Sequence, residues 1–250
     1  MTDTPLLEIA ANSLASALAA QEAGAARVEL FASLGEGGVT PSYATIALAR
    51  DRLRIPLYAL IRPRAGDFLY NDFELETMIG DIEACARLGC DGVVIGALDE
   101  DGNVALAECR TLIAAAGTLA VTFHRAFDLA RDPRSALEDV VALGCARVLT
   151  SGQAETAPAG TELIRELVDQ SAQRIVIMPG GGIDADNIGD LKLKTGATEF
   201  HASAKRTLAS GMHHRPQRLR DMQSGETRSD GNQIRRMLQA LAGTSRKSVG

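Results

Sequence analysis

Gly89-Cys90-Asp91-Gly92-Val93-Val94-Ile95 is typical of a helix that ends at a glycine and is followed by a short apolar strand. Glycine suits the position just after a helix, since it adopts the left-handed conformation at little cost. A continuous apolar run is typical of a strand that is buried on both faces, as the strands of parallel sheets are. The same pattern recurs from Gly24, Gly117, Gly144 and Gly196.

Eight such strands are predicted, with helical patterns between them. The strands are expected at Leu6–Ala11, Arg27–Ala32, Pro56–Pro63, Gly92–Ala97, Ala120–Arg125, Arg147–Gly152, Arg174–Gly180 and Glu199–Ala204. The clearest helix signals are Ser13–Gly24 with a cap at Asn12 or Ser13, a long helix from Asn71 or Asp72 to Leu88, and a start at Asp132-Pro133. This alternation indicates parallel strands that close into an α/β fold, a single (β/α)8 barrel of the TIM type. A doubly wound open sheet is the alternative.

One domain is predicted over residues 1–250, with the barrel core at about 6–205. Residues 206–232 are polar and lack clear periodicity, and a C-terminal helix is expected at about 233–243. A loop of this length in a compact domain is usually functional or disordered. Because it follows the eighth strand, we expect either a lid over the mouth of the barrel or a solvated tail.

The composition excludes several classes of protein. A net charge of −6 argues against a general nucleic-acid binder, which is normally basic. No apolar run approaches the length of a membrane span, and the first residues do not resemble a signal peptide. The four cysteines, Cys85, Cys90, Cys109 and Cys145, are expected to be reduced, buried thiols of a cytoplasmic protein. A homo-oligomer is left open.

Ionisable side chains interrupt the apolar strands at Glu8, Glu29, Arg62, His124 and His201. Such groups are costly to bury unless they are paired, so they indicate either a structural network or a functional site. The carboxyl ends of barrel strands so often form sites that we predict a catalytic site containing Glu8, Glu29, His124 and His201. These four residues could also hold a metal ion, although their spacing matches no recognised ligand motif.

An anion site is predicted at the same mouth. Its candidate residues are Arg62, Arg64, Gly180, Gly181, Gly182 and Ser203, with Lys205 nearby. Arginines suit a carboxylate or a phosphate, and glycines let backbone N–H groups approach its oxygen atoms. The alternatives are an arginine that pairs with Asp67 or Glu29 and a glycine triplet that only forms a tight turn. Asp67, Arg125, Asp128 and Ser151 are expected to support the site.

Several ungapped blocks resemble the CutC, or copper homeostasis, family. They include Glu36-Gly-Gly-Val-Thr-Pro-Ser42, Ile61-Arg-Pro-Arg-Ala-Gly-Asp-Phe68, Ala120-Val-Thr-Phe-His-Arg-Ala-Phe-Asp128 and Arg147-Val-Leu-Thr-Ser-Gly152. The resemblance implies a cytoplasmic barrel, and the family name implies copper as the only cofactor suggested. Relatives carry cysteine after the first strand and at the end of the second, where this chain has Ala10, Ala11 and Phe31. Copper(I) prefers thiolate and thioether ligands, so the likeliest copper site is missing here.

The sequence is compatible with three functions. The first is a copper-binding protein of the cytoplasm, and the second is an enzyme that acts on a small anionic or phosphorylated metabolite. The third is a scaffold without chemistry at its mouth. We prefer the enzyme, with His124 and Glu8 or Glu29 transferring a proton while Arg62 and Arg64 hold the anion.

Overall fold

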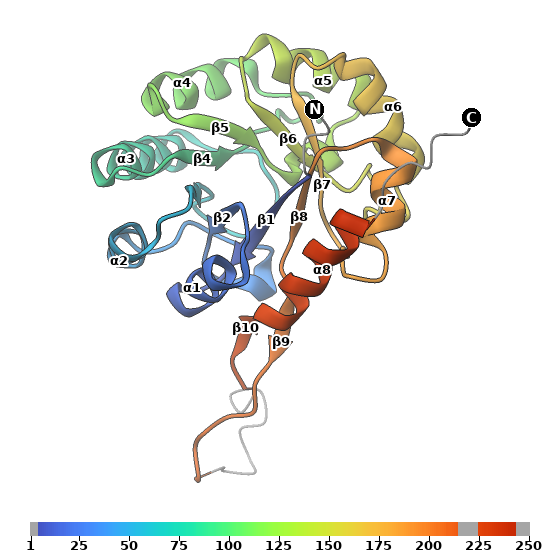
Figure 1. The fold of residues 1–250 in the computed structure, drawn as a ribbon. Coiled ribbons are helices and arrows are strands. Elements are labelled where there is room, and N and C mark those ends of the chain that lie inside the picture. Colours follow the sequence, from blue (N-terminus) through green and yellow to red (C-terminus); the bar gives the residue numbers. More distant parts are fainter. Residues whose placement is uncertain (1–4, 215–224, 244–250) are drawn as a thin grey trace, which may run out of the picture.

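Eight parallel strands form a nearly closed barrel that is surrounded by helices (Figure 1). The computed structural model describes residues 5–214 and 225–243. The barrel strands are β1 (Leu6–Ala11), β2 (Arg27–Leu30), β3 (Leu57–Leu60), β4 (Gly92–Ile95), β5 (Ala120–Phe123), β6 (Arg147–Thr150), β7 (Val176–Pro179) and β8 (Glu199–Ala202). Their hydrogen-bonded order is β7-β6-β5-β4-β3-β2-β1-β8, and a parallel bridge between Gly180 and His201 brings β7 beside β8. The predicted (β/α)8 barrel is therefore confirmed.

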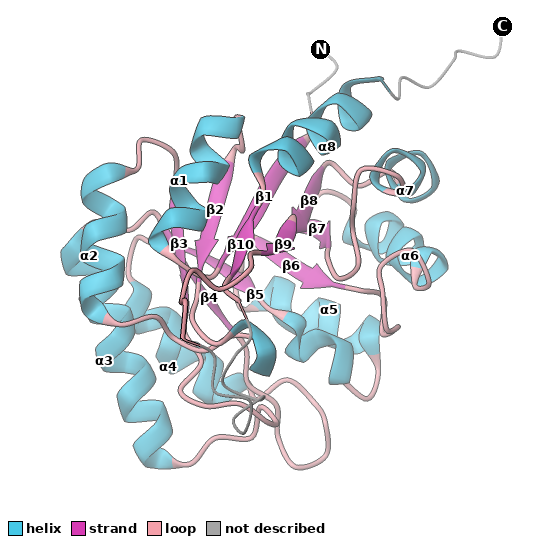
Figure 2. Cartoon of the chain, turned by 90° about the horizontal axis from the view of Figure 1, so that it is seen from below, coloured by secondary structure: helices cyan, strands magenta, loops and turns pink. Residues whose placement is uncertain are grey.

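Helices follow the strands and pack around the outside of the barrel (Figure 2). They are α1 (Leu14–Ala23), α2 (Tyr43–Arg52), α3 (Asp72–Leu88), α4 (Leu106–Ala116), α5 (Pro133–Ala142), α6 (Thr161–Ser171), α7 (Ile188–Thr195) and α8 (Gly231–Gly243), with 3-10 helices η1 (Leu34–Glu36) and η2 (Arg125–Leu129). The predicted caps are present, because Ser13, Asn71 and Asp132 each accept a hydrogen bond from the first turn of their helix. Among the described helices, none combines the length and the apolar character needed to cross a membrane.

The glycine repeat that predicted the fold marks helix ends in the structure. Gly24, Gly89 and Gly196 cap their helices with φ of 94°, 78° and 73°, and Gly144 follows α5 with φ of 78°. A residue with a side chain is strained in this left-handed region, so glycine is the natural choice there. The next strand then starts within a few residues, which keeps the barrel regular.

The strands after β1 end one to three residues earlier than predicted. Arg62, His124 and Ser203 therefore lie just beyond the strands, at the mouth of the barrel. At this rim the backbone leaves the hydrogen-bonded ladder to form loops, although the apolar pattern continues. Side chains at the mouth are consequently held by loops as well as by the sheet.

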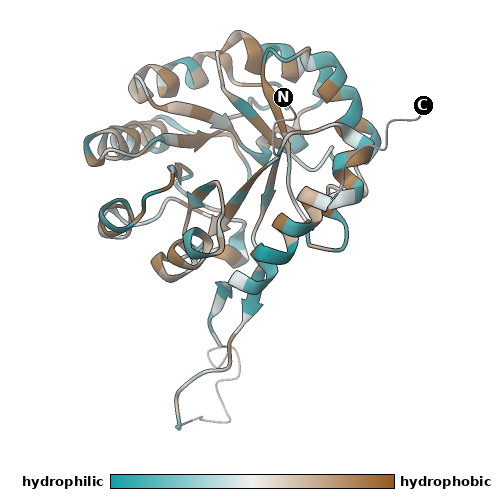
Figure 3. Cartoon of the chain, in the orientation of Figure 1, coloured by the Kyte–Doolittle hydropathy of each residue, from teal (hydrophilic) through white to brown (hydrophobic). Residues whose placement is uncertain are grey.

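The polar segment after β8 forms a hairpin at its base. Strands β9 (Lys205–Thr207) and β10 (Thr227–Ser229) pair antiparallel, and the pair projects away from the barrel in Figure 1. Figure 3 shows these strands as mostly hydrophilic. Asn12 and Ser16 anchor β10, because the Asn12 amide donates to the Thr227 carbonyl oxygen and the Ser16 hydroxyl accepts from the Ser229 N–H.

The sequence left open whether residues 206–232 form a lid or a solvated tail, and this stays a prediction. Within the described part of residues 206–232, no residue lines the cavity at the mouth. Residues 215–224, which belong to the same predicted segment, lie outside the described residues. The side of the mouth next to β8 is instead lined by Gln233, Arg236 and Met237 of the C-terminal helix.

Two apolar clusters divide the interior. The larger one lies between the strands and the helices and includes Leu7, Ile9 and Phe200. The smaller one lies inside the barrel and comprises Ala10, Phe31, Tyr58, Leu60 and Val94. Because the side chains of a strand alternate between faces, residues two apart from this inner cluster also point into the barrel. Polar and charged side chains occupy the remaining inward positions.

Candidate functional site

A cavity of about 690 Å³ opens at the carboxyl ends of the strands. Of the predicted site residues, it is lined by Glu29, Arg62, His124, Arg125, Gly181, Gly182, His201 and Ser203. The others do not line it: Glu8, Arg64, Asp67, Asp128, Ser151 and Gly180. Apolar side chains, among them Phe31, Leu60 and Phe68, share the lining. A pocket of this size and mixed character suits a small organic molecule.

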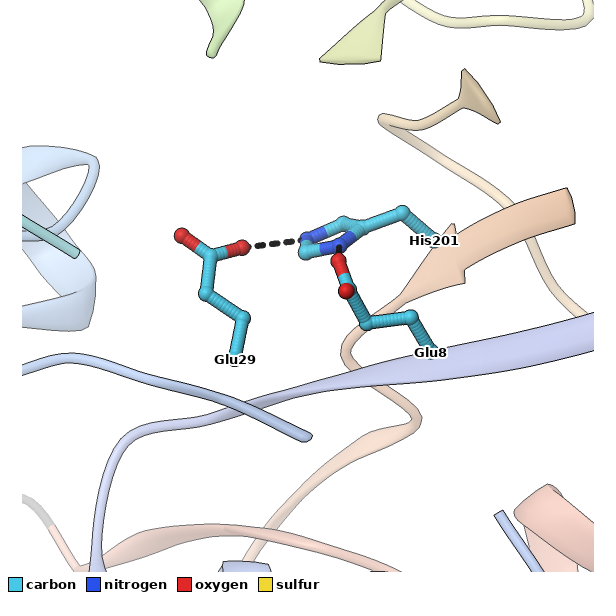
Figure 4. A group of neighbouring side chains, drawn as sticks. All are labelled: Glu8, Glu29 and His201. Atoms are coloured by element: carbon cyan, nitrogen blue, oxygen red, sulfur yellow. Dashed lines mark hydrogen bonds and ion pairs between the residues drawn. The ribbon is translucent and has the colours of Figure 1, made fainter. Parts of the chain in front are cut away.

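Strand register brings three of the predicted catalytic residues together. Glu8 on β1 is paired in register with Arg27 on β2 and with His201 on β8, so these side chains leave the sheet on the same face. His201 Nδ1 lies 2.7 Å from Glu8 Oε1, and its Nε2 lies 3.4 Å from Glu29 Oε2. Figure 4 shows the imidazole between the two carboxylates. The structure therefore brings Glu8, Glu29 and His201 together, while their catalytic role stays a prediction.

The three groups have different proton affinities. Burial opposes a charge on Glu8, but the hydrogen bond with His201 and the charge of Arg27 outweigh it and hold the pKa of Glu8 at about 2. Burial raises the pKa of Glu29 to about 7, and the neighbouring Glu8 carboxylate adds to this effect. Burial also disfavours a charged His201, yet the Glu29 charge and the Glu8 hydrogen bond raise its pKa. Glu8 is therefore an anion, while Glu29, with a pKa of about 7, lies beside a His201 whose pKa is raised.

A layer of buried charged side chains holds Glu8 in place. Arg27 contacts Glu8 through Nε, and its Nη2 lies 2.7 Å from Glu199 Oε2. Arg147 shares this carboxylate at 3.0 Å and donates to the Tyr58 hydroxyl. Our prediction did not include this layer. The signal was available, because Arg27 and Glu199 stand two residues before Glu29 and His201 and so share their faces.

Arg62 is a buried cation at the wall opposite His201. It is 6% exposed and makes no ion pair within the described chain, with neither Asp67 nor Glu29 beside it. Its Nη atoms donate to the carbonyl oxygens of Glu36, Gly38 and Gly66, while its buried Nε has no hydrogen-bond partner among the described residues. The Tyr70 hydroxyl also interacts with the Arg62 guanidinium. A buried charge without a counter-ion is costly, so this arrangement favours an anionic ligand.

His124 provides a second unpartnered donor beside Arg62. Its Nδ1 accepts a hydrogen bond from the Ala126 N–H, so the neutral ring carries its proton on Nε2, which is buried without a partner among the described residues. Burial, and then the charge of Arg62, lower the pKa of His124 to about 3. His124 is therefore a fixed hydrogen-bond donor. This differs from our expectation that it acts as the acid or base.

Phe68 and Gly96 hold the His124 ring in place. The ring centroids of Phe68 and His124 are 4.8 Å apart, and the Arg62 guanidinium carbon lies 5.0 Å from the Phe68 centroid. A methyl group at Gly96, just after β4, would lie 2.5 Å from His124 Nδ1. Only glycine leaves room for the imidazole at this point.

Arg64 does not belong to the cavity, which differs from the anion-binding role expected for it. Its Nε binds Glu74 at 2.5 Å, and its Nη2 binds Asp67 at 3.0 Å and the carbonyl oxygen of Leu69 at 2.8 Å. Asp67 therefore holds the loop through Arg64. Arginines two apart on this loop point to different partners, because the turn redirects the chain between them.

The remaining supporting residues form one hydrogen-bonded group. Asp128 accepts from the Thr150 hydroxyl at 2.5 Å and from the Ser151 N–H at 3.0 Å. Arg125 donates from Nε to Asp128 at 2.7 Å and from Nη2 to the Ser151 hydroxyl at 2.8 Å. The group ties η2 to the loop after β6 and orients Arg125 at the cavity wall.

The donor atoms at the mouth do not suit copper(I). Glu8, Glu29 and His201 offer oxygen and nitrogen atoms that lie within 4.8 Å of one another, a set that could hold a harder cation. All four cysteines are buried, and none of them lines the cavity: Cys85, Cys90, Cys109 and Cys145. Ala10 and Phe31 do line it, and neither offers a ligand atom in its side chain.

Comparisons with known proteins agree on one family. The sequence model of the CutC family matches residues 5–206. A CutC family protein of Xylella fastidiosa (strain Temecula1) is 53% identical over 236 residues, which cover 94% of this chain and 88% of that protein. A CutC family protein of Chromobacterium violaceum is 56% identical over 210 residues, or 84% of this chain and 85% of that protein.

A solved structure shares both fold and sequence. It is a crystal structure from Streptococcus agalactiae of a protein described provisionally as the copper homeostasis protein CutC. It superposes with a TM-score of 0.77 at 34% identity, over 80% of this chain and 98% of that one. An aldolase, QR15, superposes with a TM-score of 0.63 at 16% identity and is similar in fold alone.

Proposed function

This chain belongs to the CutC family, and for this member we propose an enzyme that binds a small anionic metabolite at the barrel mouth and transfers a proton on it. One observation carries the proposal. Glu29, with a pKa of about 7, and His201, with a raised pKa, line the same cavity as Arg62 and His124. Arg62 Nε and His124 Nε2 are buried there without a hydrogen-bond partner among the described residues. Proton affinities of this kind, matched to neutral pH, are typical of general acid–base catalysts.

The two walls of the cavity have different roles in the proposed reaction. Glu29, which contacts His201, removes a proton from a carbon atom of the ligand that is next to a carbonyl or carboxylate group. The electron pair of the broken C–H bond moves toward the carbonyl, whose oxygen gains negative charge. Arg62 and the His124 N–H stabilise this oxyanion, and Glu29 then returns the proton to the same or a neighbouring carbon. A single donor to such an oxyanion accelerates comparable reactions by ~100- to 1,000-fold.

Glu8 is a positioning residue in this scheme. It accepts from His201 Nδ1, which leaves Nε2 directed at Glu29. Arg27 holds Glu8 ionised, so the imidazole faces a permanent negative charge on its far side. That charge stabilises the imidazolium when His201 carries the shared proton.

Solvent isotope exchange tests the proposal. A thermal-shift screen of keto acids, hydroxy acids and their phosphate esters supplies ligands, because a ligand of the folded state raises its stability. Each hit is incubated with the protein in D₂O, and NMR follows the loss of its C–H signal. We expect exchange by the wild type and its loss in Glu29→Gln, with Glu22→Gln as an exposed control on α1. Hits that bind without any exchange by the wild type would refute the catalytic role.

A role in copper homeostasis is the second candidate, since the solved relative carries that description. The cluster of Glu8, Glu29 and His201 supports a metal ion, although these ligands suit copper(II) rather than copper(I). Arg27 competes for the same Glu8 carboxylate, so a metal ion would have to displace a buried ion pair. For either function, the four free cysteines support a cytoplasmic location.

A further inference from the structure

Besides Arg62 and His124, the cavity has a further group of donors. They lie beyond the carboxyl ends of β5, β7 and β8. Arg125 is fixed by two of its three nitrogen atoms, since Nε binds Asp128 and Nη2 binds Ser151. Its Nη1 makes no hydrogen bond within the described part of the chain. A methyl group placed on Gly181 would lie 3.4 Å from this atom. The guanidinium is therefore held with one free edge beside the glycine turn after β7.

The glycine turn lines the cavity and has backbone amides without an acceptor among the described residues. The Gly181 carbonyl oxygen accepts from the Ala157 N–H, and the Gly182 carbonyl oxygen accepts from the Asn187 side chain. Every described peptide bond is trans, so each following N–H points away from those partners. The N–H groups of Gly181, Gly182 and Ile183 have no acceptor among the described residues, although all three residues line the cavity. Gly181 and Gly182 have φ of 98° and 69°, which glycine adopts without strain.

The segment after β8 adds two more groups to this wall. The Ser203 hydroxyl has no hydrogen-bond partner and Lys205 has no ion pair within the described chain, and both line the cavity. The acidic neighbours are largely engaged. Asp184 accepts from the N–H groups of the next turn, and Asp186 pairs with Arg236 at 3.1 Å. Glu155, which is exposed, and Glu29 are the other carboxylates in the lining.

We propose that this wall, defined by Arg125, the Gly181–Gly182 turn, Ser203 and Lys205, is a subsite for the phosphate group of a phosphomonoester. It rests on the proposed function, because it receives the far end of the ligand whose carbonyl or carboxylate meets Arg62 and His124. The donors come from the segments that follow β5, β7 and β8, and their number suits a tetrahedral group with three terminal oxygen atoms. The Arg62 side offers fewer donors, which suits a planar carboxylate. The substrate class is a short phosphorylated keto or carboxylic acid.

Calorimetric titration tests the subsite with three probes: inorganic phosphate, glycolate and 2-phosphoglycolate. We expect phosphate to bind the wild type, and 2-phosphoglycolate to bind more tightly than either single group, because it occupies both subsites. Arg125→Met should weaken phosphate binding by about tenfold or more, since it removes a charge-assisted hydrogen bond. Arg131→Met is the matched control, because Arg131 pairs with Asp101 on the surface.

Arg125→Met also removes the ion-pair partner of Asp128, so misfolding is an alternative cause of lost phosphate binding. Two further variants exclude that cause. Ser203→Ala and Lys205→Met change side chains that hold no other residue, and each should weaken phosphate binding by about threefold or more. Arg62→Met should leave inorganic phosphate binding unchanged while it removes the advantage of 2-phosphoglycolate. Far-UV circular dichroism checks that each variant is folded.

The outcomes separate this inference from the proposed function. The inference fails if phosphate does not bind the wild type at millimolar concentration. It also fails if phosphate binding is lost in Arg62→Met and kept in Arg125→Met, which would put the phosphate on the other wall. In both cases glycolate binding that depends on Arg62, or exchange that depends on Glu29, would leave the proposed function standing.

Discussion

His201 Nδ1 lies 2.7 Å from Glu8 Oε1, and this contact joins the first and last strands of the barrel across their parallel pairing. Glu8 is 1% exposed and ionised, so it fixes one side of the imidazole. The other side is left to Glu29 at 3.4 Å. The barrel strands therefore hold both carboxylates in place beside the imidazole of His201.

The raised pKa of Glu29 predicts how stability changes with pH. Folding raises this pKa from an ordinary 4.5 to about 7, so the linked stability is fully present below pH 4.5 and is lost as pH rises through 7. Glu29→Gln removes that loss. We expect the stability of Glu29→Gln relative to wild type to increase between pH 4.5 and 8 in urea unfolding. Glu22→Gln, at an exposed position, should show a constant difference, and a constant difference for Glu29→Gln would refute the assigned pKa.

Much of the fold could be predicted because its signals are local. The glycine after each helix and the apolar run of each strand depend on neighbouring residues, so β1 was placed at Leu6–Ala11 as observed. The ends of the other strands were placed too far along, since side-chain pattern does not report where hydrogen bonding between strands stops. The hairpin of β9 and β10 has a polar sequence without strand periodicity, and its pairing depends on residues 20 or more apart.

The candidate site was only half predictable. Ionisable residues in apolar strands identified Glu8, Glu29 and His201, because strand alternation alone determines which face they share. The roles of the two histidines depend on contacts that the sequence does not contain. His124 lies beside Arg62, which contributes to its low proton affinity, whereas His201 lies between two carboxylates. Arg62 and Arg64 likewise differ only through the turn between them.

Gly96→Ala tests whether the position of His124 matters for binding. The added methyl group would lie 2.5 Å from His124 Nδ1, so the ring has to move. We expect a stability loss of ~1–3 kcal/mol from overpacking, together with loss of ligand-induced thermal stabilisation. Gly80→Ala is the control, because a methyl group there meets nothing within 4 Å and the position is inside α3. That variant should gain ~0.5–1 kcal/mol and keep ligand binding.

The donor set predicts weak copper(I) binding. No thiol lines the cavity in the described residues, and the four cysteines are packed among apolar side chains. Titration of copper(I) against a competing chelator should show no tight one-to-one complex with the folded protein. Tight binding that survives replacement of all four cysteines would contradict this account of the ligands. Tight binding that is lost with Cys90 or Cys145 would show that these thiols are more accessible than the structure indicates.

Arg62→Met separates ligand binding from loop structure. Loss of the buried guanidinium should weaken a carboxylate ligand by about 10- to 100-fold, because a charge-assisted hydrogen bond is removed. It should also raise the pKa of His124, since the Arg62 charge is the second cause, after burial, of its low value. The new pKa stays below the ordinary 6.5, because burial of the ring remains. NMR titration of the His124 ring protons measures this shift, which a purely structural change in the loop would not produce in this direction.

Arg64→Met is the control on the same loop, because its guanidinium binds Glu74 and Asp67 outside the cavity. If Arg64→Met weakened the ligand as much as Arg62→Met, loop disorder rather than the missing charge would explain both results.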